Sequence, residues 1–108
     1  MPTFDDREKG FEAKYSHDQE LNFKITVRRN KLLGLWAAQQ LGKSGADAEA
    51  YAKEVVASDF EKKGEDDIIG KVAGDFKAKG VAIDADAVRR KLHHLGDEAA
   101  AEVKAGKP

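Results

Sequence analysis

Cysteine is absent from this sequence of 108 residues, which excludes disulfide bonds, thiol catalysis and thiolate metal sites. Apolar runs are short, and none approaches the roughly 18 residues that a membrane-spanning helix requires. The amino terminus has neither the basic start nor the apolar stretch of a secretion signal. These absences predict a soluble, cytoplasmic protein that does not insert directly into the membrane.

The chain also has no large excess of charge of one sign. Charged residues make up 36% of it, against a usual fraction of about 25%, but the formal net charge is only −1. This balance favours neither nucleic acid nor anionic lipid as a partner. The length allows one small domain, which has little surplus surface for a deep catalytic cleft. An apolar fraction of 41% is enough for a core.

The first 45 residues divide into two parts of different charge. Residues 1–20 carry six acidic and three basic side chains, whereas residues 21–45 carry five basic side chains and no acid. Apolar residues are few in the first part and crowded in the second. No proline occurs between Phe4 and Leu41, so the whole stretch is compatible with one helix. An arm with few apolar residues that leads into a core helix with many indicates a segment kept available for a partner.

Three aromatic residues characterise this arm. Phe4, Phe11 and Tyr15 are seven and four residues apart, so a helix would place their rings on one narrow stripe. Gly10 interrupts the segment and costs about 1 kcal/mol relative to alanine. Three rings do not offset the ordering entropy of about fifteen residues at about 1–2 kcal/mol each. We therefore predict that residues 1–18 form an arm that is mobile or partly disordered in the free protein.

Helix starts and stops recur along the rest of the chain. Capping signals occur at Ser16 and Ser44, and Asp84 is placed to cap the last helix. Gly42 and Gly80 are natural helix stops. Helical periodicity is present throughout and strand alternation is not, so we predict an all-α fold.

Four apolar faces follow from this periodicity, and each would be buried against the others. In chain order they are Leu21, Ile25, Arg28, Leu32, Leu35, Trp36 and Gln39; Ala48, Tyr51, Ala52, Val55, Val56 and Phe60; Ile68, Ile69, Val72, Ala73 and Phe76; Val88, Leu92, Leu95, Ala99 and Val103. Short connections between such helices predict a small antiparallel four-helix bundle over residues 19–105.

A partial phosphate-binding motif is present at Gly42-Lys43-Ser44. A complete motif needs a glycine where Ala37 stands and a strand before the loop, whereas this segment is helical. A helix stop followed by a solvated lysine and a cap is the preferred interpretation. The sequence thus gives no Walker-type nucleotide site.

Two adjacent histidines, His93 and His94, have the acids Asp97 and Glu98 four residues on, at a spacing that shares a helix face. The sequence indicates no third metal ligand, so surface histidines paired with acids are the preferred interpretation. No nucleophile with a base and an orienting acid can be assembled either. We therefore predict that the protein is not an enzyme and has neither a metal nor a cofactor.

A basic run made by Arg28, Arg29 and Lys31 could contact phosphates. A solvated helix face is the more frequent role of such a run. Trp36 lies among leucines and is better explained as a core residue than as a stacking platform for a base.

Several segments resemble the zeta subunit of alphaproteobacterial F-type ATP synthases. The resemblance runs in register along nearly the whole chain and weakens beyond about residue 80. The segments that carry it are Thr3-Phe4-Asp5-Asp6-Arg7-Glu8, Phe11-Glu12-Ala13-Lys14-Tyr15, Arg28-Arg29-Asn30-Lys31-Leu32-Leu33-Gly34-Leu35-Trp36-Ala37-Ala38, Ala50-Tyr51-Ala52-Lys53-Glu54-Val55-Val56 and Asp59-Phe60.

This resemblance implies a four-helix bundle with a mobile arm that inhibits ATP hydrolysis by the catalytic head of the synthase. The arm would become helical on binding, in a groove between catalytic subunits and beside the rotor. Its apolar anchors would be Phe4, Phe11 and Tyr15, with a polar rim of Asp5, Asp6, Arg7, Glu8, Glu12 and Lys14. The protein would then be peripheral to the inner membrane through the synthase.

Two other functions compete with this one. The bundle could be a regulatory sensor that binds adenine nucleotide at Arg28, Arg29 and Lys31. A nucleic-acid binder is disfavoured by the acid-rich second helix and the net charge. We expect the free protein to be a monomer.

Overall fold

The computed structural model describes the backbone of residues 4–61 and 64–106, and the side chains of residues 19–59 and 64–106. Its elements are four helices: α1 (Phe4–Gln40), α2 (Gly45–Glu61), α3 (Glu65–Lys79) and α4 (Ala85–Lys104). The all-α prediction is confirmed. No helix within the described ranges is long and apolar enough to cross a membrane.

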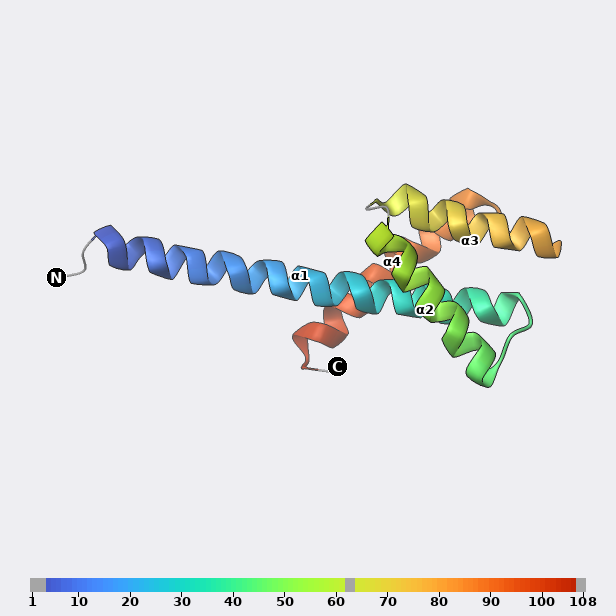
Figure 1. Cartoon of the computed structure of the whole chain (residues 1–108), viewed down its shortest axis with the longest axis horizontal. Helices are drawn as coiled ribbons and strands as arrows, with labels where there is room; N and C mark the ends of the chain where they lie inside the picture. Colours follow the sequence, from blue (N-terminus) through green and yellow to red (C-terminus); the bar gives the residue numbers. More distant parts are fainter. Residues whose placement is uncertain (1–3, 62–63, 107–108) are drawn as a thin grey trace.

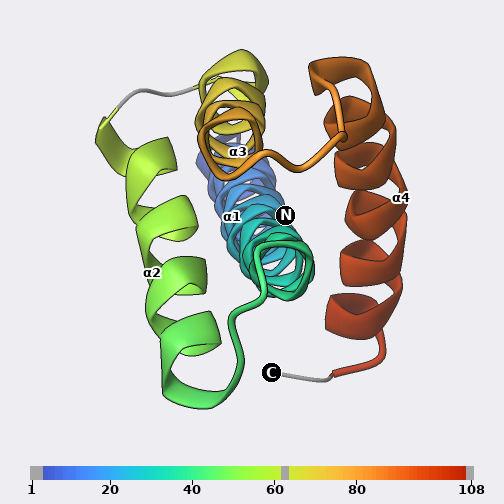
Figure 2. The same cartoon turned by 90° about the vertical axis from the view of Figure 1, so that its right-hand side faces the viewer.

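Helix α1 is the central element of the molecule. It lies between α2 and α4, which pack against it from opposite sides and, within the described ranges, do not contact each other (Figure 2). Helix α3 lies above α1 in this view, between α2 and α4, and contacts all three helices. Successive helices run in opposite directions, as expected for a small antiparallel bundle (Figure 1).

The amino-terminal half of α1 projects well beyond the other three helices (Figure 1). The molecule therefore measures 66 × 24 × 21 Å along its principal axes. A helix rises about 1.5 Å per residue, so the 37 residues of α1 account for most of the long dimension. One continuous helix thus supplies both a bundle element and the projecting arm.

The predicted helix ends are confirmed at both glycines and at the aspartate. Gly42 and Gly80 adopt positive φ angles of 78° and 79°, a conformation that glycine reaches without steric cost. The Oδ1 atom of Asp84 accepts a hydrogen bond of 2.8 Å from the backbone N–H of Ala87. These local signals fix the chain reversals that return each helix to the bundle.

The core lies where the three other helices meet α1. Its fully buried members, all with less than 2% of their surface exposed, include Leu33, Val55, Ile68, Val72, Phe76, Val88 and Leu92. Most of the predicted faces of α2, α3 and α4 are confirmed, while Phe60 lies outside the residues whose side chains are described. Trp36 packs edge-on against Phe76 with ring centroids 5.6 Å apart, which confirms its role in packing.

The predicted apolar face of α1 is partly wrong. Gln39 is exposed, whereas Ala37 and Ala38 are completely buried. The reason is that α1 is covered from three directions, so its buried surface is wider than a single stripe. Small residues on this face let the neighbouring helices approach closely.

Candidate partner-binding surface

The arm predicted to bind a partner is the part of α1 that leaves the bundle (Figure 1). Its backbone continues the helix from Phe4 without a break. The side chains predicted to anchor it, and those predicted as its polar rim, lie outside the residues whose side chains are described: Phe4, Asp5, Asp6, Arg7, Glu8, Phe11, Glu12, Lys14 and Tyr15. Their contacts therefore stay predictions, and the described part of the site is the region where α1 emerges.

At this point α1 is joined to both neighbouring helices by polar contacts. The Nε atom of Arg28 donates a hydrogen bond of 2.7 Å to Glu102 Oε2 on α4, and both side chains are about 29% exposed. On the opposite side, the Nδ2 atom of Asn30 donates a hydrogen bond of 3.2 Å to Asp59 Oδ2 on α2. Two contacts within three residues thus connect α1 to α4 and to α2.

Asn30 is the buried polar residue of this region, with 1% of its surface exposed. Its Oδ1 atom accepts a hydrogen bond of 3.1 Å from Arg29 Nε, so the amide both donates and accepts. The methylenes of Arg29 pass over Gly96 of α4, where an added Cβ would stand 3.4 Å from Arg29 Cδ. Arg29 is therefore held by packing against α4 and by Asn30.

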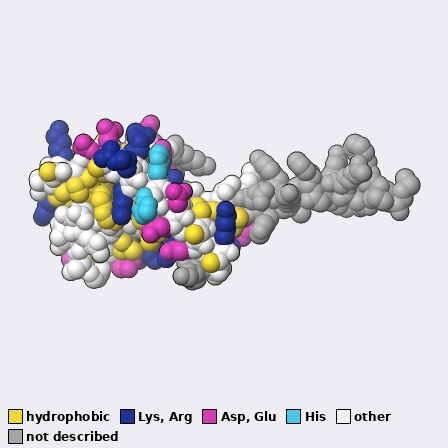
Figure 3. Space-filling view, turned by 180° about the vertical axis from the view of Figure 1, so that it is seen from behind, with side chains coloured by type: hydrophobic (Ala, Val, Ile, Leu, Met, Phe, Trp, Pro, Cys, Tyr) yellow, Lys and Arg dark blue, Asp and Glu magenta, His cyan; other side chains and the backbone are white. Residues whose placement is uncertain are grey.

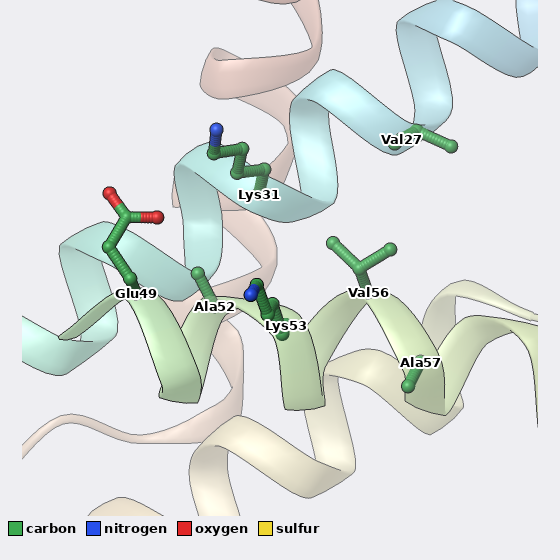
Figure 4. Close-up of a pocket in the computed structure, with 7 residues that line it drawn as sticks. All are labelled: Val27, Lys31, Glu49, Ala52, Lys53, Val56 and Ala57. Carbon is green, nitrogen blue, oxygen red and sulfur yellow. The ribbon is translucent and has the colours of Figure 1, made fainter. Parts of the chain in front are cut away.

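A shallow apolar hollow of about 330 Å³ lies between α1 and α2. Figure 4 shows Val27 and Val56 near one end of it, with Lys31 and Glu49 near the other. Its remaining lining residues are Ala52, Lys53 and Ala57. The hollow is open to solvent and mostly apolar, so it resembles a surface for a side chain of a partner more than a cofactor site.

A second hollow of about 790 Å³ lies on the α4 side of the same helix. It shares Val27 and Lys31 with the first, and adds Lys24 and Arg28 as further cations. Apolar residues from both helices complete it, among them Leu21 and Val103, together with Phe23, which is 55% exposed, and Gly106. Basic side chains around an apolar floor would suit a ligand with a negative group and a flat apolar part.

The structure brings together only two of the three predicted nucleotide-binding residues. Arg28 and Lys31 line the larger hollow, and Lys24 joins them there. Arg29 lines neither of the two hollows and is turned toward Gly96 instead. Part of the Arg28 charge is moreover neutralised by Glu102, which weakens the attraction that this region offers to a phosphate.

The histidine pairs differ in part from the prediction. His94 lies 4.0 Å from Glu98 as expected, but His93 contacts Glu65 at the start of α3 instead of Asp97. Arg89 also reaches this end of α3, at 3.1 Å from Asp66 and 3.7 Å from Glu65. Figure 3 shows basic, acidic and histidine side chains interspersed on this face. No group of three or more metal-ligating residues occurs within the described part of the chain.

A separate polar network joins α2 to α3. The hydroxyl of Tyr51 donates a hydrogen bond of 2.7 Å to Asp75 Oδ2, which also accepts one of 3.2 Å from Lys71. Burial first, and then the hydrogen bond and charge of Asp75, raise the pKa of Tyr51 well above its usual value; Glu54 adds to this effect. The tyrosine is thus a neutral structural donor and not an acid–base group.

Sequence reasoning missed the residues that hold α1 at its exit from the bundle. Asp59 is notable in the sequence only as part of the family resemblance, and Glu102 has no distinguishing feature there. The signal in the sequence is weak: an asparagine among apolar helical positions, with no indication of the helix that faces it. Only the packing of α2 and α4 on α1 brings these carboxylates to Asn30 and Arg28.

Comparison with known proteins agrees with the fold and with the resemblance of the sequence. Residues 1–102 match the family described as ATPase inhibitor subunit zeta. A protein solved by solution NMR is 45% identical in sequence and superposes with a TM-score of 0.70, over 80% of this chain and 98% of its own. Among curated proteins, none matches.

Proposed function

The chain belongs to the ATPase inhibitor subunit zeta family, and on this premise we propose how it inhibits. The arm of residues 1–18 inserts as a helix into an interface between catalytic subunits of the F-type ATP synthase head, beside the rotor. Residues 19–105 form the bundle that carries the arm. A rod at a catalytic interface blocks the opening and closing that hydrolysis requires. The protein is then cytoplasmic and held at the inner membrane through the synthase.

The observation that supports this proposal most is the continuity of α1 from Phe4 to Gln40. The same helix that forms the centre of the bundle extends away from it, so its outer half has a surface that α2, α3 and α4 leave uncovered (Figure 1). An amphipathic helix of this kind binds by laying its apolar side chains into a groove. The aromatic stripe of Phe4, Phe11 and Tyr15 provides the apolar side chains.

Burial of the aromatic stripe supplies part of the driving force for such an insertion. Burial of each aromatic side chain contributes about 1.5–3 kcal/mol, from which the cost of ordering the arm is subtracted. The first turn of a new helix is the costly step in helix formation. An arm that is continuous with the bundle part of α1 avoids that step.

The proposal is tested by titrating ATP hydrolysis by the cognate catalytic head with the full chain and with a chain lacking residues 1–18. We expect the full chain to inhibit and the truncated chain not to inhibit. Circular dichroism should show that the bundle is equally helical in both proteins. Equal inhibition by both would assign the activity to the bundle and overturn the role of the arm.

A second candidate function, binding of adenine nucleotide, is favoured by one observation. Lys24, Arg28 and Lys31 surround the apolar floor of the larger hollow beside the exposed ring of Phe23. Calorimetry of the full chain with ATP tests it, with Lys31→Ala as the variant that should weaken binding. The absence of measurable heat at millimolar ATP would eliminate this function and leave the arm mechanism unaffected.

A further inference from the structure

The exit of α1 from the bundle is held by four side chains, which we call the polar girdle: Arg28, Asn30, Asp59 and Glu102. Its two contacts face opposite sides of α1, 2.7 Å to α4 and 3.2 Å to α2. Both carboxylates lie within the last turn of their helices, α2 ending at Glu61 and α4 at Lys104. The girdle therefore joins the carboxyl-terminal ends of α2 and α4 to an interior part of α1.

The placement of these carboxylates costs stability locally. A helix carboxyl terminus carries partial negative charge, so an acid in the last turn is unfavourable there. A buried amide is also costly unless its hydrogen bonds are made. Asn30 and the two acids therefore depend on these contacts, and loss of the contacts would leave the cost of their placement uncompensated. The best-attested benefit of such a buried polar contact is a fixed register.

We propose that Arg28 and Asn30 are positioning residues, which hold residues 19–30 helical and in line with the bundle so that the arm extends an existing helix. The consequence for inhibition rests on the function proposed above. Arg28 and Asn30 connect α1 to the last turns of α4 and α2, respectively. The girdle accordingly holds α1 to both neighbouring helices in the region where α1 leaves the bundle.

Amide hydrogen exchange of the full chain tests this directly and does not require the synthase. The variant Arg28→Met/Asn30→Leu keeps the side-chain bulk and removes both contacts. We expect the amides of residues 20–27 to lose protection by about tenfold or more, because each lost contact is a charge-assisted or buried hydrogen bond. The amides of residues 33–40, the segment of α1 that carries the buried Leu33, Ala37 and Ala38, should change by less than about twofold.

Two matched variants separate the girdle from general destabilisation. Tyr51→Phe removes a 2.7 Å contact between α2 and α3 and should leave residues 20–27 unaffected. Arg28→Lys keeps the charge opposite Glu102 and should retain most of the protection. Equal loss of protection in residues 20–27 and 33–40, or no loss in either, would overturn the proposal.

Inhibition assays then connect the girdle to the arm. Arg28→Met/Asn30→Leu should weaken inhibition of the catalytic head, whereas Tyr51→Phe should not. Reduced protection of residues 20–27 together with unchanged inhibition would overturn the link between girdle and arm. If the chain lacking residues 1–18 inhibits fully, the arm mechanism itself fails, while the exchange result still decides whether the girdle holds the helix.

Discussion

Gly34 of α1 lies directly against Ala52 of α2, where an added Cβ would stand only 2.6 Å from the Ala52 Cα atom. Since the obstructing atom belongs to a backbone, no side-chain rotation can relieve the clash. The two helices would have to move apart, and Val55, which is fully buried beside them, would lose contacts. The absence of a side chain at Gly34 thus sets the distance between α1 and α2.

The substitution Gly34→Ala is therefore expected to destabilise the bundle by about 1–3 kcal/mol, because overpacking outweighs the gain in helix propensity. Urea denaturation followed by circular dichroism measures this. Gly74→Ala is the matched control, since Gly74 is helical and an added Cβ would meet nothing within 4 Å apart from the adjacent backbone of its own helix. It should stabilise the protein by about 0.5–1 kcal/mol. A stabilising effect at both positions would contradict the close approach of the helices.

The cap of α4 predicts a second stability effect. Asp84→Ala removes the acceptor for the Ala87 N–H and should cost about 1 kcal/mol. Asp84→Asn retains an acceptor oxygen and should cost much less. Thermal or urea unfolding of the two variants provides the comparison, and equal losses would show that the charge, and not the cap, is responsible.

Alkaline pH should lower the stability through Tyr51. Its pKa is raised in the folded protein, so the folded state retains a proton that the unfolded state releases near its ordinary pKa of about 10. The stabilisation is therefore complete below pH 10 and is lost as the pH rises above that value. Urea unfolding between pH 8 and pH 11 measures the effect, and Tyr51→Phe should show a shallower decline. Parallel declines in the two proteins would contradict this role.

The arm and the bundle should be separable by single substitutions. Replacement of Phe11 or Tyr15 by alanine is expected to weaken inhibition by about tenfold or more, from the loss of about 1.5–3 kcal/mol of apolar burial in the complex. The free energy of unfolding should stay within about 0.5 kcal/mol of the parent value. Inhibition titrations and urea denaturation of the same preparations test both statements. Stability and inhibition falling together would mean that the two regions are not separate.

Much of the fold was predictable because its signals are local. Gly42, Gly80 and Asp84 end or begin helices through their own backbone preferences or side chains, and these positions are confirmed. The apolar repeats of α2, α3 and α4 identify most of the core for the same reason. The face of α1 was harder to predict, because a helix covered by three others buries residues such as Ala37 that a single stripe does not include.

The contacts at the candidate site depend on how helices cross, which the sequence does not encode locally. The contact of His93 with Glu65 follows from the packing of α3 on α4, whereas the sequence suggested Asp97 from helix spacing alone. Arg29 looked equivalent to Arg28, yet the two side chains reach different parts of α4. Interactions between distant segments, and not the elements themselves, limited the prediction.

The measurement that tests the central claim most directly is photo-crosslinking of the assembled inhibitor and catalytic head. A photoreactive phenylalanine analogue at Tyr15 should cross-link to the catalytic subunits or the rotor, because that ring is predicted to lie in their groove. The same analogue at the exposed Gln39, at the opposite end of α1, should give no such product. Cross-linking from Gln39 but not from Tyr15 would contradict insertion of the arm.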